Sequence, residues 1–303
     1  MMKYAYYPGC SLEGISVEYD LSMRRLFEQL EVTVEDLPEW ICCGTLAAPS
    51  MSRLLGVATP LWNVARATLE GFDQLIAPCS ACVYHFKNAV KQVEDKPDLR
   101  IEVENVLEMS LESQTPTIHP LELLVQDSFE ERIKSSLKRD LSDLKVVAYY
   151  GCHISRPAKV MQFDDPENPQ SMDQILEWAG AQVLDWSAKV DCCGAHFSMI
   201  KPEIAVDLCS QLIKAALQVG ADAIVVACPM CHANLDTRQE MIAEKMDRPL
   251  DLPVFYFSQV LGYAMGLGEN QLGMTKHLVD PLPLMLEKCR QRNGHDHTLE
   301  KGI

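Results

Sequence analysis

Short apolar stretches alternate with longer segments of helical periodicity along most of the chain. The most apolar stretch, Ala-Ile-Val-Val-Ala at 223–227, is typical of a strand buried on both faces of a parallel sheet. Other stretches rich in β-branched or aromatic residues predict further strands at 3–7, 32–34, 74–77, 145–150, 182–186 and 252–257. Apolar residues at helical spacing predict helices at 15–30, 51–70, 172–179 and 204–217. Strands that alternate with helices indicate an α/β fold.

The same order of elements occurs twice, which predicts an internal duplication. We expect two duplicated Rossmann-like α/β domains, with cysteine-bearing loops at the carboxyl-terminal ends of the strands, where open α/β sheets usually place ligands. The first domain is predicted at 1–115 and the second at 144–303, which includes a polar tail. The segment 116–143, with two prolines and mixed charges, is expected to be a linker with a helix from Leu121 onward. The last ten residues, with a His-Asp-His sequence, are expected to fray.

Composition narrows the class of protein. The chain has 303 residues, enough for two domains that each bury a core, and 48% of them are hydrophobic. A net charge of −16 argues against nucleic acid as a partner, because no basic patch could dominate that field. No apolar run reaches the roughly 18 residues of a membrane helix, and the amino terminus has no signal-peptide core. We therefore expect a cytoplasmic protein without a membrane span, in which clustered thiols bind metal or do redox work rather than form a disulfide framework.

Ten of the twelve cysteines form one pattern that is used twice. Each copy has a single cysteine after a strand, an adjacent Cys-Cys-Gly, and a C-x-x-C at the start of a helix. The gaps between the three parts are 31 and 35 residues in the first copy and 39 and 34 in the second. The first copy comprises Cys10, Cys42, Cys43, Cys79 and Cys82, and the second Cys152, Cys192, Cys193, Cys228 and Cys231.

This pattern favours an iron–sulfur cluster in each copy. Thiolates are soft ligands for iron–sulfur clusters, zinc or copper(I), and five of them exceed the four that tetrahedral zinc uses. Adjacent cysteines point apart, so a centre with several irons accepts both more readily than a single ion does. Two structural zinc sites, or simply buried thiols or disulfides, are the alternatives. Cys209 lies in a helical pattern and is expected to be a packed thiol, and Cys289 an incidental surface thiol.

At these residues the chain resembles the cysteine-rich, or CCG, domain found in the B subunit of heterodisulfide reductase. The resemblance spans almost the whole chain. It rests on Tyr-Tyr-Pro-Gly-Cys at 6–10, Tyr-Tyr-Gly-Cys-His at 149–153, Cys-Cys-Gly-Ala-His at 192–196, Cys-Pro-Met-Cys-His at 228–232 and His-Leu-Val-Asp-Pro at 277–281. No ferredoxin-like cysteine segment precedes it, so the chain resembles the stand-alone subunit rather than a fused form.

The resemblance implies an oxidoreductase acting on sulfur groups. Each set of five cysteines would bind one [4Fe-4S] cluster of the non-cubane type, with zinc as the alternative in the amino-terminal site. The two clusters would face a shared cavity in which a small disulfide is cleaved, or formed, by one-electron steps. The implied partners are the ferredoxin-like C subunit and the flavin-bearing A subunit of the same complex. Two other functions stay open: oxidative sulfur metabolism on a thiol or persulfide, and a non-catalytic electron relay in a dehydrogenase.

Three histidines lie close to the cysteines in sequence, namely His153, His196 and His232. Each is a candidate to hydrogen-bond a ligand sulfur or to donate a proton to a departing thiolate. A loop histidine bonded to backbone is the alternative for each of them. Arg156 and Lys201 are weaker candidates for attracting an anionic thiol, because single basic residues near turns are usually solvated.

Overall fold

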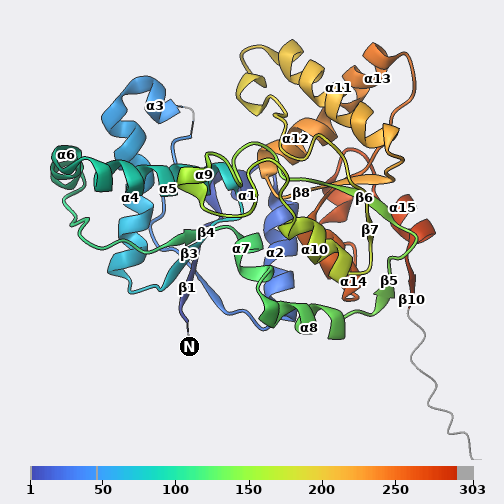
Figure 1. Cartoon of the computed structure of the whole chain (residues 1–303), viewed down its shortest axis with the longest axis horizontal. Helices are drawn as coiled ribbons and strands as arrows, with labels where there is room; N and C mark the ends of the chain where they lie inside the picture. The colour runs from blue at the N-terminus through green and yellow to red at the C-terminus, as the bar shows by residue number, and fades with distance from the viewer. Residues whose placement is uncertain (1, 46, 292–303) are drawn as a thin grey trace, which may run out of the picture.

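The computed structural model describes residues 2–45 and 47–291, and in this range the chain forms two four-stranded parallel sheets. The first sheet has the order β2-β1-β3-β4 and the second β7-β6-β8-β9. Numbered within each half, both sheets have the order 2-1-3-4. The predicted α/β fold with a duplicated Rossmann-like unit is therefore confirmed, and Figure 1 shows the two units side by side.

The first half contains four strands and the helices that cover them. The strands are β1 (Tyr4–Tyr6), β2 (Val34–Asp36), β3 (Gln74–Ile76) and β4 (Thr117–Ile118). The helices are α1 (Gly9–Glu13), α2 (Val17–Gln29), α3 (Ala47–Met51), α4 (Arg53–Leu69), α5 (Ser80–Asp95) and α6 (Pro97–Leu107). The strand predicted at 32–34 lies instead at Val34–Asp36, because the chain first turns after α2 through Glu31, whose φ is +52°.

The second half repeats this arrangement. Its strands are β6 (Lys145–Tyr149), β7 (Gln182–Val183), β8 (Ala223–Val226) and β9 (Val254–Tyr256). Its helices are α9 (Ala158–Met161), α10 (Ser171–Trp178), α11 (Pro202–Gln218), α12 (Pro229–Thr237), α13 (Gln239–Met246), α14 (Phe257–Ala264) and α15 (Leu282–Lys288), with 3-10 turns η1 (Ala195–Phe197) and η2 (Met274–Lys276). All four residues of β8 are buried, as its sequence predicts.

The segment 116–143, expected to be a linker, is structured from its beginning. Thr117 and Ile118 form β4 and pair with β3, so they complete the first sheet as β9 completes the second. Helices α7 (Pro120–Leu124) and α8 (Asp127–Ser135) follow, and β5 (Arg139–Asp140) pairs antiparallel with β10 (Arg290–Gln291). A two-residue strand between prolines carries too little apolar pattern to be predicted from sequence. The division of the chain into domains stays a prediction, and the frayed tail lies outside the described residues.

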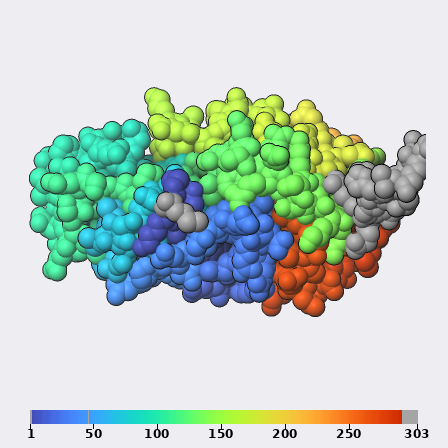
Figure 2. Space-filling model, turned by 90° about the horizontal axis from the view of Figure 1, so that it is seen from below, coloured from blue at the N-terminus to red at the C-terminus, as the bar shows by residue number. Residues whose placement is uncertain are grey.

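The two halves share one hydrophobic core. Helix α2 of the first half packs against α14 of the second, and α10 of the second packs against α7 and α8. Tyr19 on α2 stacks on Tyr256 at the end of β9, with ring centroids 4.0 Å apart, and the Ser22 and Ser258 hydroxyls lie 2.7 Å apart. Figure 2 shows the green part of the chain, which contains α7 and α8, lying between the blue and the orange ends. The halves therefore stabilise each other through buried contacts.

We expect the described fold to unfold in a single transition, and Tyr19→Ala to lower its free energy of unfolding by about 3–5 kcal/mol, because a fully buried ring at the contact between the halves is lost. Leu69→Ala is the control, since Leu69 is 64% exposed and its truncation should cost no more than about 0.5 kcal/mol. Denaturant titration followed by circular dichroism measures both. Two separate transitions would contradict a shared core.

Candidate metal–sulfur centre

The parallel strands bring the cysteines to the same edge of each sheet. Cys10 follows β1 and Cys152 follows β6, whereas Cys79 and Cys228 follow β3 and β8. Cys79 and Cys228 are the residues directly before the first turns of α5 and α12, so each C-x-x-C opens a helix as predicted. The partial positive charge of a helix amino terminus favours thiolates there.

The two Cys-Cys-Gly loops are anchored in the same way in both halves. The Tyr7 hydroxyl donates a hydrogen bond to the Ile41 carbonyl oxygen (3.0 Å), and the Tyr149 hydroxyl donates to that of Asp191 (2.7 Å). Each tyrosine stands three residues before the first cysteine of its copy, and each acceptor directly before the Cys-Cys pair. The copies therefore share a hydrogen bond that fixes the loop at the end of the sheet.

The glycine after each cysteine pair has a backbone conformation that other residues rarely adopt. Gly44 has φ +77° and Gly194 φ +75°. A Cβ at Gly44 would lie 2.7 Å from the Ala48 Cβ, and one at Gly194 would lie 2.9 Å from the Ala205 Cα. Both positions thus require glycine for the sharp turn that presents the pair.

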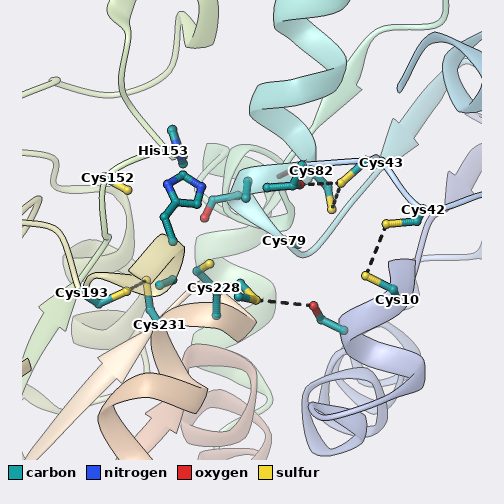
Figure 3. A pocket seen from close by; sticks show the side chains of 18 of the residues that line it. Cys10, Cys42, Cys43, Cys79, Cys82, Cys152, His153, Cys193, Cys228 and Cys231 are labelled. Atoms are coloured by element: carbon teal, nitrogen blue, oxygen red, sulfur yellow. Dashed lines mark hydrogen bonds between the residues drawn. The ribbon is translucent and has the colours of Figure 1, made fainter. Parts of the chain in front are cut away.

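All ten patterned cysteines line one cavity of about 290 Å³. Figure 3 shows the first-half cysteines on one side of it and Cys152, Cys193, Cys228 and Cys231 on the other. In each adjacent pair the first cysteine is exposed and the second is buried. The structure thus brings together residues that lie up to 221 positions apart, from Cys10 to Cys231, at one site.

The sulfur atoms form close pairs along the cavity wall. The sulfur–sulfur distances are 3.6 Å for Cys10 and Cys42, 3.1 Å for Cys43 and Cys82, and 3.5 Å for Cys193 and Cys231. Hydrogen bonds from neighbouring thiols favour ionisation of one partner in such groups. The hydrogen bond from Cys42 lowers the pKa of Cys43, that from Cys152 lowers the pKa of Cys192 to about 6, and those from Cys231 and Cys79 lower the pKa of Cys228.

His119 joins the two halves behind the cysteines. Its buried Nε2 lies 2.8 Å from the Pro78 carbonyl oxygen and 3.0 Å from that of Ala227, so an N–H there donates to both. Its Nδ1 accepts from the Leu121 backbone N–H at 3.2 Å, which fixes this tautomer. The two acceptors directly precede Cys79 and Cys228. One imidazole therefore holds the two C-x-x-C turns beside each other, and sequence reasoning missed it because it lies in the expected linker.

The structure separates the three predicted histidines. His153 and His196 both line the sulfur cavity, with ring centroids 6.1 Å apart, and burial lowers the pKa of His153. His232 lies on α12, and its ring instead stacks on Tyr256. Its Nε2 lies 3.0 Å from the Val254 carbonyl oxygen. This placement outside the sulfur cavity matches the alternative of a histidine bonded to backbone.

One histidine near the centre was not singled out from the sequence. His85 lies on α5 one turn after Cys82, and together with His153 and His196 it lines a neighbouring cavity. Burial lowers the pKa of His85. The signal that could have found it is its i+3 spacing from Cys82 on a predicted helix, which puts both residues on one face.

The remaining candidates lie outside the sulfur cavity. The Arg156 guanidinium donates to the Pro166 carbonyl oxygen (2.6 Å) and to Glu167 (2.5 Å), so it ties down a loop. Lys201 is exposed before α11. Cys209 is buried and its thiol donates to the Cys193 carbonyl oxygen (3.3 Å), as expected of a packed thiol. Cys289 is half-buried, with its sulfur 4.0 Å from that of Met285, rather than a surface thiol.

The donor set fits a centre with several metal ions. Within residues 2–45 and 47–291, no three His, Cys, Asp or Glu side chains converge on one point that could hold a single ion. The ten thiols instead line a common space, five from each half. Clusters of iron and sulfide need soft ligands distributed in this way.

The cysteine-rich domain family, CCG, matches the chain at residues 4–87 and 146–236, which together make up more than half of it. The chain belongs to this family. The two matched segments correspond to the two halves of the structure and contain all ten patterned cysteines. Membership confirms the family resemblance expected from the motifs.

Named relatives of this CCG protein are subunits of redox complexes. It is 29% identical to the 8-methylmenaquinol:fumarate reductase membrane anchor subunit of Wolinella succinogenes, over 93% of this chain and 99% of that one. It is 27% identical to the B subunit of the ferredoxin/F420H2-dependent CoB-CoM heterodisulfide reductase of Methanosarcina acetivorans, over 94% of this chain and 96% of that one. These similarities support an iron–sulfur-related electron-transfer role.

One solved structure has a similar fold. The crystal structure of a hypothetical protein from Helicobacter pylori superposes with a TM-score of 0.74 at 14% identity, over 92% of this chain and 52% of that one. The CCG protein thus spans about half of that longer chain, and the likeness concerns the fold alone. None of the helices in the described residues combines the length and the apolar character that crossing a membrane requires.

His119 should make the stability of the protein depend on pH. Burial lowers its pKa from 6.5 to about 4, so the folded chain keeps the ring neutral where the unfolded chain already binds a proton. The stabilisation is complete above about pH 6.5 and is lost as the pH falls toward 4, by up to about 3 kcal/mol. Denaturant titrations between about pH 8 and about pH 4 measure this loss. As the pH falls, the free energy of unfolding should decrease more steeply for the wild type than for His119→Gln, whose side chain does not titrate. Parallel curves would rule out this role.

The tyrosine anchors should contribute equally in the two halves. Tyr7→Phe and Tyr149→Phe each leave a carbonyl oxygen before a Cys-Cys pair without its donor, and we expect each to lower the free energy of unfolding by about 1–2 kcal/mol. Tyr4→Phe is the matched control, because the Tyr4 hydroxyl contacts only the Met2 sulfur in the part of the chain described. Urea titration measures all three, and an effect in one half alone would argue against equivalent anchors.

Proposed function

We propose that this CCG protein is the iron–sulfur subunit of a heterodisulfide-reductase-like complex, which reductively cleaves, or in reverse forms, a disulfide. In this proposal Cys10, Cys42, Cys43, Cys79 and Cys82 bind one [4Fe-4S] cluster, and Cys152, Cys192, Cys193, Cys228 and Cys231 bind the other. Both clusters are proposed to be of the non-cubane type, with zinc in the amino-terminal site as the alternative.

The observation that carries the proposal is that both sets of five cysteines line a single cavity. Two metal sites with a purely structural role would not need to share a cavity. Reducing a disulfide takes two electrons and two protons, breaks the sulfur–sulfur bond and yields two thiols. Bound iron–sulfur clusters supply electrons one at a time. A disulfide held between the two cysteine sets would thus have one electron source on each side.

The protein's own groups would position the disulfide and handle protons. The walls beside the sulfurs are largely apolar or neutral side chains, such as Ala47, Ala81 and Met230, which exclude water from the reacting bond. His153 and His196 are the two imidazoles on this wall, and their N–H groups can hydrogen-bond a departing thiolate. His153 directly follows Cys152, and its ring lines the cavity.

Electrons would come from other chains of the complex. Cys10, Cys42 and Cys192 are exposed, and we propose that substrate enters past them. We propose a ferredoxin-like C subunit as the direct electron donor and a flavin-bearing A subunit behind it. The named relatives that are heterodisulfide reductase subunits support such a complex.

A second function has its own support. The relative from Wolinella succinogenes is named as a subunit of an 8-methylmenaquinol:fumarate reductase, which favours an electron relay in a dehydrogenase complex as the alternative. The other alternative, oxidation of a thiol or persulfide, would use the same two sets of cysteines with electrons flowing in the opposite direction. An experiment on the isolated complex with an external electron donor distinguishes them. The proposal expects the complex to reduce a disulfide, whereas the two alternatives do not.

Metal analysis of anaerobically purified protein tests the proposal. We expect about eight irons and about eight sulfides per chain, and an electron paramagnetic resonance signal that changes when thiol is added. Cys43→Ser and the equivalent Cys193→Ser should each lose about half of the iron, because each removes one buried ligand from one set. Cys289→Ser, outside the cavity, should keep all of it.

Disulfide reduction by the complex decides between one centre and two. Both Cys43→Ser and Cys193→Ser should lower the rate at least about tenfold if the two sets act together. Full activity in either variant would exclude the paired arrangement. Iron in one half with zinc in the other would leave a single redox centre, and zinc in both would overturn the proposal.

A further inference from the structure

The two sets of five cysteines are equivalent, but the residues beside them are not. The residue after Cys-Cys-Gly is Thr45 in the first copy and Ala195 in the second. Within the C-x-x-C, the first copy has Ser80 where the second has Pro229. At both positions the first half thus carries a hydroxyl, whereas the second half carries a side chain that cannot donate a hydrogen bond. We call Thr45 and Ser80 the hydroxyl pair.

Thr45 contacts a cysteine of its own set. Its Oγ1 lies 2.8 Å from the sulfur of Cys43, a residue that is only 2% exposed, so the contact is shielded from water. Between a hydroxyl and a free thiol either atom can donate, but a thiolate that binds metal has no proton to give. In a metal-loaded centre the Thr45 hydroxyl is therefore the donor.

Ser80 contacts a cysteine of the other set. It directly follows Cys79, yet its buried side chain hydrogen-bonds the sulfur of Cys228. The His119 imidazole holds the two C-x-x-C turns beside each other, so a side chain of one turn reaches a sulfur of the other. Pro229, which directly follows Cys228, has neither a hydroxyl nor a backbone N–H to offer. The first half thus supplies a hydroxyl that the second half lacks.

Hydrogen bonds to ligand sulfurs change the free energy of reduction of an iron–sulfur centre. One-electron reduction adds a negative charge, and part of this charge resides on the ligand sulfurs. A donor to such a sulfur stabilises the reduced form more than the oxidised form and so raises the reduction potential. The low dielectric constant around a buried contact strengthens this effect. Each hydroxyl should therefore raise the potential of the centre whose sulfur it contacts.

We propose that the hydroxyl pair sets the reduction potentials of the two centres. Thr45 acts on the amino-terminal centre, held by the first five cysteines, and Ser80 on the carboxyl-terminal centre, held by the second five. This inference rests on the proposed function, which supplies the two centres, and it adds the residues that tune them. Each centre receives one hydroxyl, which suits a reaction that takes one electron from each side of a disulfide.

A redox titration of the cluster-loaded chain tests the proposal. The full chain is purified without oxygen and reduced stepwise with dithionite as the electron donor, while electron paramagnetic resonance and visible absorption follow the centres. We expect Thr45→Val to lower the equilibrium constant for reduction of one centre about tenfold, which is about 59 mV for a one-electron couple. Ser80→Ala should lower the constant of the other centre by a similar factor.

Half-loaded variants assign each shift to a centre. Cys193→Ser leaves the amino-terminal set complete, and Cys43→Ser leaves the carboxyl-terminal set complete. In the Cys193→Ser background, Thr45→Val should lower the potential and Ser80→Ala should not. In the Cys43→Ser background the two effects should be exchanged. An effect of Ser80 on the set opposite to its own in sequence is a result that a general loss of structure does not produce.

Two control variants test whether the hydroxyl itself is responsible. Thr45→Ser retains the hydroxyl and should keep the wild-type potential. Ser11→Ala removes a hydroxyl of the same cavity that lies 4.0 Å from the Met230 sulfur, and it should leave both potentials unchanged. Iron content and circular dichroism are measured for every variant. An unchanged potential in loaded Thr45→Val or Ser80→Ala, or an equal shift in Ser11→Ala, would overturn the proposal.

Disulfide reduction separates this proposal from the proposed function. If the potentials shift as expected but the complex reduces no disulfide, the role of the hydroxyl pair stands and the proposed function fails. If a disulfide is reduced while both variants keep the wild-type potentials, the proposed function stands and the role of the hydroxyl pair is refuted.

Discussion

The pair of hydrogen bonds from the His119 imidazole is the constraint on which the arrangement of the site depends. The Pro78 and Ala227 carbonyl oxygens are buried after β3 and β8, and leaving the Pro78 oxygen without a donor would cost about 1–3 kcal/mol. The Ala227 oxygen also accepts a longer hydrogen bond, of 3.4 Å, from the Tyr19 hydroxyl. Because α5 and α12 begin directly after these carbonyls, the imidazole sets the spacing between the two buried C-x-x-C turns. The ring itself is held by the Leu121 N–H, and Glu122 caps the His119 backbone N–H at 2.9 Å.

Around the His119 contact, several features of the two halves are equivalent, but the residue at the position of His119 itself differs. The tyrosine anchors and the glycines after the cysteine pairs are equivalent, and so are the capping boxes that begin α7 and α14. The residue equivalent to His119 at the start of α14 is Tyr256, which stacks on Tyr19 and His232 instead of bridging carbonyls. Duplication thus supplied two equivalent sets of five cysteines, whereas the imidazole that bridges the two C-x-x-C turns occurs in one half alone.

The sequence predicted the parts of the site that repeat and missed those that occur once. The ten cysteines, the strand ends that carry them and the helices that begin at Cys79 and Cys228 could be predicted because two copies confirm each other. His119 could not, because β4 has only two residues and its surroundings read as a linker. Proximity in sequence was a poor guide for histidines: His232 is next to Cys231 but points away from it, since adjacent helical residues face different sides. His85, three residues after Cys82, lies on the useful face.

The exposure of the cysteines has a consequence for how the centre is assembled. Cys79, Cys82, Cys228 and Cys231 are buried, whereas Cys10, Cys42 and Cys192 are exposed. If the cysteines bind metal as proposed, metal and sulfide from solvent would meet the exposed thiols before the buried ones. The Cys43 and Cys82 sulfur atoms lie 3.1 Å apart, so an oxidant that accepts two electrons and two protons from the two thiols could convert them to a disulfide. In the proposed centre such a disulfide would remove two ligands at once, so metal would have to be loaded before the thiols met an oxidant.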